Sequence, residues 1–409
     1  MSGPLEGFRV LDLSRVLAGP LVAQMLGDLG AEVIKIEKPG EGDDSRTYGP
    51  PFLATPDGRR TRESGFYLSA NRNKRSVTVD LATEAGQDLV RRLAGKSDIV
   101  VENFRVGSLA KFGLDYASLS ALNPRLIYLS ITGYGQTGPM ANRPGYDAIF
   151  QASGGHMAVT GSADDLAGGG PMRSGLSIVD ILTSLYAAVA VLAAISHRDR
   201  TPEGKGQYID VALLDSMVAT LSHRGVQYLI SGRASPRRGN VGAGGSPSGA
   251  FKCADGLIVL TIGNDLQWQR FCTAIGQPGL ANDPRFGTAT RRIENRETLS
   301  PVLEPMFAAK DKAHWLEVLQ IADIPSGPVN ELPEVFADPQ VRERGMVVSV
   351  PHPLSGVLDL IANPIRFSET PIDCYESPPT LGQHTESVLR DLLGVAESEL
   401  RALKEAKII

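Results

Sequence analysis

RVLDLSRVLAGPLVAQMLGDLGAEVIKIEK, residues 9–38, decides the fold class of this 409-residue chain. RVLDLS (9–14) and EVIKIEK (32–38) are apolar runs typical of strands, and residues 20–29 between them have helical spacing. Two strands joined by a helix predict a parallel βαβ unit, because parallel strands need a crossover connection. The turn after the first strand, RVLAGP, lacks a GxGxxG fingerprint, so the unit does not indicate a dinucleotide cofactor.

The same alternation of strands and helices continues through the first third of the chain. Residues 83–98 have helical spacing, and a long apolar helix is expected over about residues 175–196. Further strands are expected at SVTVDL (76–81), DIVVENF (98–104), LIYLSITG (126–133) and QYIDVAL (207–213), the last leading into a helix near residues 215–231. This order predicts an α/β fold whose Rossmann-like large domain has a mostly parallel, doubly wound sheet.

A chain of this length is expected to form more than one domain. Residues 232–249 are rich in Gly, Ser and Pro and lead into an apparent hairpin at 250–265, so we expect a smaller α/β domain there. The predicted division is 1–200 for the N-terminal part of the large domain, 201–231 for a linker strand and helix, 232–325 for the small domain, and 326–409 for a linker and the return to the large domain.

Composition is typical of a soluble globular protein, with 42% hydrophobic and 21% charged residues. A net charge of −5 argues against a general nucleic-acid surface. The cysteines at 253, 272 and 374 form neither a disulfide framework nor a metal-ligand spacing, and the six histidines show no metal motif. The N-terminus lacks signal-peptide features, and the apolar run 181–196 is short for a membrane span. We therefore expect a cytoplasmic protein with no metal and no nucleic-acid or membrane partner.

The glycine-rich segment 131–180 carries the candidate chemistry. It holds several carboxylates and only one histidine, His156. A serine or cysteine nucleophile normally needs a base, whereas a carboxylate is already ionised at neutral pH. Asp164 in TGSADD is therefore a candidate covalent nucleophile, although aspartate is also common in turns of this composition.

Ten segments extend the pattern over nearly the whole chain: LEGFRVLDLSRVLAGP, GAEVIKIEKPGEGD, NKRSVTVDL, DIVVENFRVGSLAKFGL, NPRLIYLSITGYGQTGP, PGYDAIFQASGG, TGSAD, GKGQYIDVALLDS, RRGNVGAGGSPSGAFKCADG and LGQHTESVL. On these segments, in this order, the chain resembles the class III CoA-transferases of the formyl-CoA transferase and L-carnitine CoA-transferase type. The resemblance implies a large domain built from both chain ends, a small domain between them, and an interlocked homodimer with active sites between subunits.

The resemblance also implies reversible transfer of CoA from an acyl-CoA donor to a free carboxylic acid. The family's route passes through an aspartyl anhydride and an aspartyl-CoA thioester, with acyl-CoA as substrate and no metal. The acceptor stays open, and a small dicarboxylate is favoured because the family often uses one. The alternatives are an acyl-CoA racemase or epimerase of the 2-methylacyl-CoA type, and a non-catalytic CoA-binding protein.

Asp164 matches the family's nucleophile, which follows the TG of its motif by three residues. Asp165 is the rival, since the loop after it is longer than in formyl-CoA transferases. Racemases of the same superfamily use a GHD histidine, but here that position is Tyr146, followed by Asp147. Tyrosine, with a pKa near 10, is a poor substitute for imidazole, so racemase is disfavoured. The racemases' downstream aspartate corresponds to Asp180, which we expect to be a supporting group.

The family's CoA contacts fall on Val16, Leu17, Ala18, Lys38, Val79, Asn103, Phe104, Arg105, Lys111, Thr132, Gly133, Tyr134 and Gly135. Lys38 and Lys111 stand where formyl-CoA transferase often has arginine, and Thr132 where it has lysine. Lysine supplies charge without the planar bidentate fork of arginine. For a lysine taken alone, a solvated surface charge is the better interpretation. Arg72, Lys74 and Arg75 form a further basic cluster to which no role is assigned.

Five residues match the family's mobile glycine lid, which is GGGGQ in formyl-CoA transferase: Gly242, Ala243, Gly244, Gly245 and Ser246. Glycine suits a loop that must change φ and ψ and bring its backbone close to a ligand. Ser246 and Ala243 depart from the family pattern, so formate or oxalate is not assumed as the acceptor. The alternative for this segment is a flexible linker.

Overall fold

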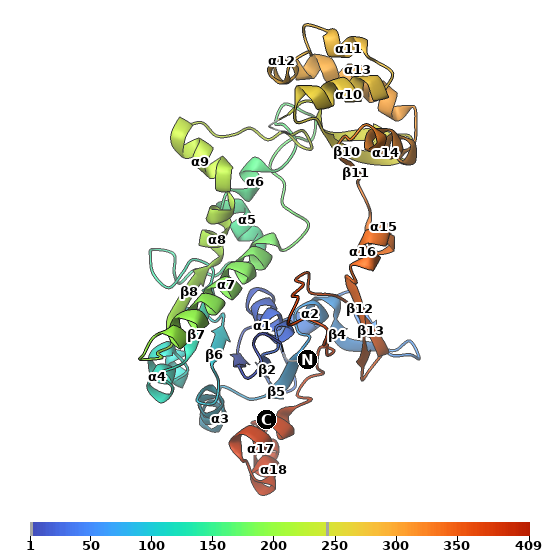
Figure 1. Ribbon diagram of the computed structural model, residues 1–409. Helices are drawn as coiled ribbons and strands as arrows, with labels where there is room; N and C mark the ends of the chain where they lie inside the picture. Colours follow the sequence, from blue (N-terminus) through green and yellow to red (C-terminus); the bar gives the residue numbers. More distant parts are fainter. Residues whose placement is uncertain (1–2, 243–244) are drawn as a thin grey trace. The chain divides into compact units, whose positions relative to one another are not determined.

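The computed structural model describes residues 3–242 and 245–409. The chain forms two compact units, and both chain ends belong to the larger one (Figure 1). The large unit comprises Met1–His156, Ser174–Gly232 and Arg342–Ile409, and the small unit comprises Met157–Arg173 and Arg233–Val341.

A six-stranded sheet forms the centre of the large unit, with the strand order β5-β2-β1-β6-β7-β8. All neighbouring strands are parallel, so the predicted α/β fold with a mostly parallel sheet is confirmed. The strands are β1 (Arg9–Asp12), β2 (Glu32–Glu37), β5 (Lys74–Thr78), β6 (Ile99–Glu102), β7 (Ile127–Thr132) and β8 (Tyr208–Ala212).

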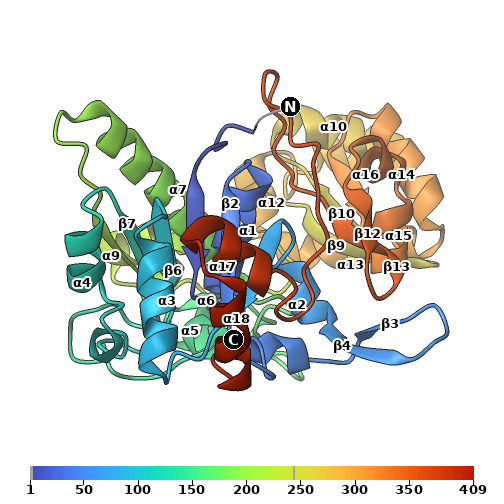
Figure 2. The ribbon, with the colours of Figure 1, turned by 90° about the horizontal axis from the view of Figure 1, so that it is seen from below.

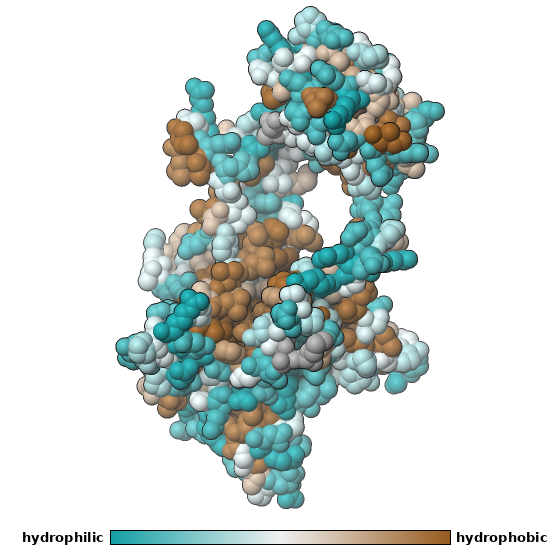
Figure 3. Space-filling model, viewed as in Figure 1, coloured by the Kyte–Doolittle hydropathy of each residue, from teal (hydrophilic) through white to brown (hydrophobic). Residues whose placement is uncertain are grey.

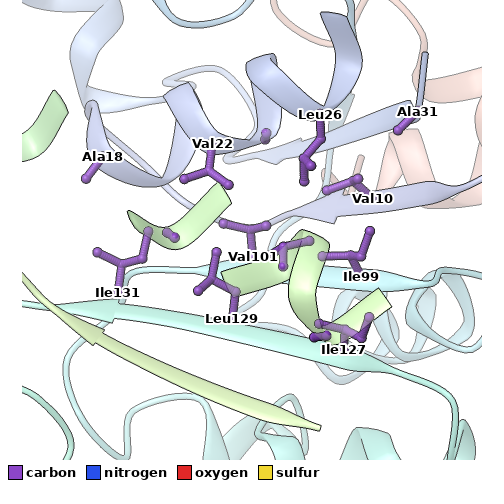
Figure 4. Close-up of a cluster of buried hydrophobic side chains, with 14 of the residues drawn as sticks. Val10, Ala18, Val22, Leu26, Ala31, Ile99, Val101, Ile127, Leu129 and Ile131 are labelled. Carbon is purple, nitrogen blue, oxygen red and sulfur yellow. The ribbon is translucent and has the colours of Figure 1, made fainter. Parts of the chain in front are cut away.

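Helices cover both faces of this sheet, as a parallel sheet requires (Figures 1 and 2). Side chains of a strand alternate between its two faces, so Val10 packs in one core and Leu11 in the other. Figure 4 shows the first core, where Val22 and Leu26 lie near strand residues such as Val101 and Leu129. The first face is covered by α1 (Ala18–Asp28), α5 (Asp147–Ser153), α7 (Ile178–Arg200) and α8 (Leu213–Thr220), and the second by α3 (Glu84–Ala94), α4 (Tyr116–Leu122), α17 (Thr385–Leu393) and α18 (Glu397–Glu405).

The predicted helix near residues 215–231 is two helices, α8 and α9 (Ser222–Ser231), and the chain turns between them where Ser222 has a φ of 46°. A positive φ does not belong to a right-handed helix. The large unit also contains η1 (Asp44–Thr47), β3 (Phe52–Ala54), β4 (Arg60–Ser64), α2 (Gly65–Ser69), η2 (Ala110–Phe112), β12 (Val347–His352) and β13 (Gly356–Ile361), while α6 (His156–Val159) and α16 (Pro339–Glu343) lie where the chain passes from one unit to the other.

The C-terminal segment LGQHTESVL covers the edge of the parallel sheet. Strand β5 is an edge strand, and the backbone N–H of Ser76 donates to Nδ1 of His384 at 3.2 Å. The N–H of Thr78 donates to Oγ1 of Thr385 at 3.0 Å, and the N–H of His384 donates to the carbonyl of Ser76 at 2.9 Å. These bonds satisfy edge groups that would otherwise be open to pairing with another chain.

The small unit has its own antiparallel sheet and its own core. The predicted hairpin is confirmed as β9 (Ser248–Cys253) paired with β10 (Gly256–Thr261), and β11 (Ser326–Pro328) adds a third strand. Its core combines Ile and Leu side chains with aromatic ones, including Trp268, Phe271 and Phe307. Its helices are α10 (Asp265–Ala274), α11 (Gly279–Asn282), α12 (Ala289–Glu294), α13 (Arg296–Ala308), α14 (Lys312–Ile321) and α15 (Leu332–Ala337).

Helix α7 is long and apolar enough to cross a membrane, judged by length and composition alone. One side of it lies in the core beside α1, through Val179, Ala187 and Val191. The other side is exposed and also apolar, and Figure 3 shows brown side chains gathered there.

Candidate active site

A cavity of about 320 Å³ lies at the carboxyl ends of β1, β6 and β7 in the large unit. The strand order changes direction between β1 and β6, and ligands of open α/β sheets bind at such a switch point. Seven of the thirteen residues predicted to contact CoA line this cavity: Val16, Ala18, Asn103, Phe104, Arg105, Thr132 and Gly133.

The other six predicted CoA residues are not part of the cavity lining. Lys38 is exposed and pairs with Glu41 at 2.6 Å, and the Lys111 ammonium lies 4.6 Å from the ring centre of Phe112. Val79 is buried in the core of the large unit. The remaining three, Leu17, Tyr134 and Gly135, flank lining residues in the sequence.

Three arginines line the cavity, and the sequence reasoning had singled out only one, Arg105. The guanidinium of Arg15 lies 5.0 Å from the ring centre of Phe104 and 3.3 Å from a carboxylate oxygen of Asp44. Arg143 belongs to a loop without a recognisable motif, whereas Arg15 directly precedes the predicted contact Val16. Guanidinium groups bind phosphate oxygens in a bidentate way, so these arginines could hold the phosphate groups of CoA.

Asp147 and Asp180 meet at the start of α7. The Oδ1 atom of Asp147 accepts hydrogen bonds from the N–H groups of Val179 at 2.7 Å and Asp180 at 3.3 Å. These bonds satisfy donors that are otherwise unpaired at a helix N-terminus. Asp180 and Tyr146 both line the cavity. Burial, with the nearby charge of Asp147, raises the pKa of the Asp180 carboxyl to about 7.

The basic cluster of Arg72, Lys74 and Arg75 is bound to carboxylates within the large unit. Arg72 pairs with Asp28 at 2.5 Å, and Arg75 pairs with Glu32 at 2.7 Å. The fully buried Lys74 is 2.9 Å from Asp12, although burial lowers its pKa to about 8. The cluster therefore stabilises the sheet and its first crossover, a role that the sequence did not reveal.

In the small unit, Asp164 lies in a closed loop. The N–H of Met172 donates to the carbonyl of Thr160 at 2.9 Å, and the N–H of Gly170 donates to the carbonyl of Ser162 at 3.2 Å. Gly161 has a φ of 128°, and a Cβ there would lie 2.0 Å from the carbonyl oxygen of Gly170. Only glycine fits that position, because any side chain would force the loop open.

Arg237 is the cation that holds Asp164. Its Nε donates to Oδ1 of Asp164 at 3.1 Å, its Nη2 donates to the same oxygen, and its Nη1 donates to the carbonyl of Ala158 at 2.9 Å. The Asp164 side chain is still 68% exposed. Among the described residues, the side chain of Asp165 has no hydrogen bond or ion pair, so the environment distinguishes the two neighbouring aspartates.

Three residues of the predicted lid lie within the described chain, and Ala243 and Gly244 lie outside it. The N–H of Gly242 donates to the carbonyl of Ser248 at 2.8 Å. The carbonyl of Ser246 accepts from Nε of the buried Arg292 at 2.7 Å, and that of Gly245 accepts from Arg296 at 3.3 Å. In residues 3–242 and 245–409, no group of three or more His, Cys, Asp or Glu side chains could hold a metal ion.

Fold and site define the class: an α/β protein with a cavity at the switch point of its parallel sheet and an exposed carboxylate in a loop of a second unit. Comparison with known proteins identifies the family. The model of CoA-transferase family III matches residues 5–385. The succinate–glutarate CoA-transferase of Agrobacterium fabrum is 44% identical over 390 residues, covering 95% of this chain and 96% of the relative.

Two further comparisons agree. The succinyl-CoA:glutarate CoA-transferase of Mus musculus is 42% identical, covering 98% of this chain and 89% of the relative. The crystal structure of a CAIB/BAIF family protein from Brucella suis has a TM-score of 0.85 and 42% identity, covering 96% of this chain and all of that one. The chain therefore belongs to CoA-transferase family III, and it is an enzyme that transfers CoA between an acyl-CoA and a carboxylic acid.

Asp180→Asn tests the raised pKa of the cavity carboxyl. Between the ordinary pKa of 3.8 and about 7, the folded protein holds a proton that the unfolded chain has lost. The free energy of unfolding of the unsubstituted protein should therefore fall relative to that of Asp180→Asn as pH rises from about 4 to about 7. The fall should exceed about 1.4 kcal/mol, which is the equivalent of one pKa unit. Urea denaturation at a series of pH values measures this, with Asp215→Asn as control. If the difference in unfolding free energy between the unsubstituted protein and Asp180→Asn does not change with pH, the raised pKa of Asp180 is contradicted.

Proposed function

We propose that the chain transfers CoA reversibly from an acyl-CoA donor to a free carboxylic acid, with Asp164 as the covalent nucleophile. The observation that carries the proposal is the exposed carboxylate of Asp164, held by Arg237 through one oxygen only. The second oxygen, Oδ2, accepts no hydrogen bond from the described residues. It is the oxygen free to attack.

The proposed reaction has four balanced steps. Oδ2 attacks the thioester carbonyl of the donor, and the CoA thiolate leaves as the mixed anhydride forms. The thiolate then attacks the aspartyl carbonyl of the anhydride, which releases the donor acid as a carboxylate and leaves an aspartyl-CoA thioester. The acceptor carboxylate displaces the thiolate from this thioester to form a second anhydride. The thiolate attacks the acceptor's acyl carbon, and Asp164 is released as a carboxylate.

Every nucleophile and leaving group in this sequence is a carboxylate or a thiolate. Each carboxylate is ionised at neutral pH, and each thiolate departs as an anion and attacks again as that anion, so no step requires proton transfer. Arg237 orients Asp164, because its Nη1 is fixed to the carbonyl of Ala158 while Nε and Nη2 hold Oδ1. The cation also stabilises the carboxylate each time Asp164 is released.

For CoA itself, we propose the cavity at the switch point, with the predicted contacts Val16, Ala18, Asn103, Phe104, Arg105, Thr132 and Gly133 along its wall. Arg15 and Arg143 add positive charge there. The remaining predicted contacts and the glycine lid of residues 242–246 belong to the same proposal. Tyr146 at the cavity supports a transferase over a racemase, because a phenol is a poor base at neutral pH.

We propose a small dicarboxylic acid as acceptor or donor acid. Relatives are named for succinate, glutarate, citramalate and mesaconate. In the small unit, Arg238 directly follows the Asp164 partner Arg237, and the next N–H, that of Gly239, donates to the carbonyl of Gly161 at 2.8 Å. Within the described residues, the Arg238 side chain has no carboxylate partner. Burial and the positive charge of Arg238 lower the pKa of Arg296, so the two cations are close enough to interact.

We also propose that the protein is a homodimer and that it works in the cytoplasm. The outer side of α7 exposes Leu185, Tyr186, Val189 and Leu192, with Val189 65% exposed (Figure 3). An apolar surface of this kind is typical of a protein–protein interface. Cys253, Cys272 and Cys374 are all free thiols, which fits a reducing compartment and which cell fractionation would test.

Asp164→Ala tests the nucleophile. We expect turnover to fall by at least about 1,000-fold, equivalent to about 4 kcal/mol of barrier, because the covalent route is lost. CoA binding, measured by calorimetry, should stay within about threefold. Acyl-CoA followed by hydroxylamine should modify Asp164 alone, as found by peptide mass mapping. Asp165→Ala is the matched control, and labelling of Asp165 or retained turnover in Asp164→Ala would refute the assignment.

Arg238→Gln tests the acid's second carboxylate. Loss of a charge-assisted hydrogen bond should raise the KM for glutarate and succinate about tenfold, while acetate and butyrate should be unaffected. Arg296→Gln should have the same effect. Arg270→Gln, which removes an exposed arginine elsewhere in the small unit, is the control. Equal changes for mono- and dicarboxylates would show that Arg238 does not select the substrate.

Val189→Asp tests the dimer. The unsubstituted protein should have twice the chain mass of 43.6 kDa in light scattering, and the variant should dissociate or fail to assemble because a charge replaces an apolar contact. Lys205→Asp, at an exposed position in the large unit, is the control. A monomeric unsubstituted protein at micromolar concentration would contradict the proposal.

A further inference from the structure

The turn between β1 and α1 contains a valine in the left-handed region. Val16 has a φ of 71° and lines the cavity at the switch point. A β-branched residue in this region is a genuine outlier, because its Cβ crowds the backbone. Such a conformation persists only where the surroundings hold it.

Asp43 holds this residue directly. The N–H of Val16 donates to Oδ1 of Asp43 at 3.1 Å, and that oxygen also accepts from the N–H of Ser45 at 2.9 Å. The other oxygen, Oδ2, lies 2.9 Å from Nζ of Lys35. The side chains of Asp43 and Lys35 are both fully buried. The two carboxylate oxygens therefore serve two different partners.

Lys35 also holds the residue at the start of the turn. Its Nζ donates to the carbonyl of Ser14 at 2.9 Å, so one ion pair fixes the backbone at both Ser14 and Val16. Between them, the N–H of Arg15 donates to Oδ1 of Asn103 at 2.8 Å, and the carbonyl of Arg15 accepts from Nδ2 of Asn103 at 2.7 Å. Side chains thus determine the path of the turn at three successive residues.

The charge state of Asp43 agrees with this geometry. Burial opposes ionisation of the carboxyl, but the charge of Lys35 and the hydrogen bonds from Ser45 lower its pKa to about 2. The carboxylate is thus ionised at any pH at which the enzyme would work. Helix α1 begins directly after this turn, and no side chain caps its N-terminus.

We propose that Asp43 and Lys35 are positioning residues for CoA, whose buried ion pair holds Val16 in its left-handed conformation and so keeps the cavity wall in its binding shape. The inference rests on the proposed function only in taking this cavity as the CoA site. Neither residue touches the ligand. A purely structural role would instead make the loss of binding follow the loss of stability.

A double-mutant cycle between Asp43→Asn and Val16→Gly separates these two roles. Asparagine has one acceptor oxygen and cannot serve both Lys35 and the N–H of Val16. Because this contact holds Val16 in its strained conformation, Asp43→Asn should weaken CoA binding about tenfold. Glycine adopts a positive φ without strain, so in the Val16→Gly protein the same change should cost no more than about threefold. Calorimetry with CoA measures both.

Stability provides the discriminating readout. Urea denaturation should show that Val16→Gly does not restore the stability lost in Asp43→Asn, because Lys35 still lacks its partner. The control is Asp28→Asn, which breaks the buried pair with Arg72 at the other end of α1. It should lower stability with no change in CoA binding beyond about threefold, and it should be additive with Val16→Gly.

Each outcome decides the inference. Coupling between positions 43 and 16 in CoA binding supports the inference. Additive effects of the two substitutions on CoA binding would overturn it. A loss of CoA binding in Asp28→Asn that follows its loss of stability would also overturn it. If Asp43→Asn does not fold, Ser45→Ala removes one hydrogen bond to Asp43 and should couple to Val16→Gly about threefold. Hydroxylamine labelling of Asp164 in the unsubstituted protein tests the proposed function separately. If Asp164 is labelled but the double-mutant cycle is additive, only the positioning role is overturned. If the unsubstituted protein does not bind CoA, both the positioning role and the proposed function are overturned.

Discussion

Pairing of four buried charges is the constraint on which the large unit depends. Lys74 lies 2.9 Å from Asp12, Asp12 lies 3.9 Å from Lys35, and Lys35 lies 2.9 Å from Asp43. Positive and negative groups thus alternate along a chain that joins β5, β1, β2 and the loop after β2. Each buried ion would be costly alone, so none of these segments can move away without leaving a neighbour unpaired. Asp12, the last residue of β1, is thereby held to β2 and β5 beside the cavity.

The two units meet different chemical requirements. A large cofactor such as CoA is bound best by a wall that is already in place, because ordering a loop upon binding lowers affinity. The turn at Val16, in the cavity that we propose for CoA, satisfies this, since buried side chains determine its backbone. A covalent nucleophile has to be reached by the substrate and then released. Asp164, the nucleophile that we propose, has an exposed side chain, one engaged oxygen and a loop closed by backbone hydrogen bonds.

Much of the fold could be predicted from the sequence, because a buried parallel strand is a continuous apolar run. EVIKIEK indicated a strand despite its lysines, yet the burial of Lys35 could not be foreseen, since lysine is normally exposed. The partners of Lys74 come from other segments of the chain, which spacing cannot reveal. Helical spacing also continues through Ser222, so the break between α8 and α9 was missed. In the site, Arg143 comes from a loop without a motif, and only the folded chain brings it to the cavity.

The segment of residues 131–180 contains a single histidine, and its last residue, Asp180, has a carboxyl that titrates near neutral pH. This carboxyl lies at the cavity beside Asp147, and burial with that neighbouring charge raises its pKa to about 7. At neutral pH a large share of the molecules therefore carry it uncharged. The reaction that we propose, among carboxylates and thiolates, would bring several negative charges together, and a further fixed anion would repel them. A racemase needs such a group as a base opposite an imidazole, whereas Tyr146 supplies no base here. The same aspartate is thus better suited to limiting negative charge than to taking a proton from carbon.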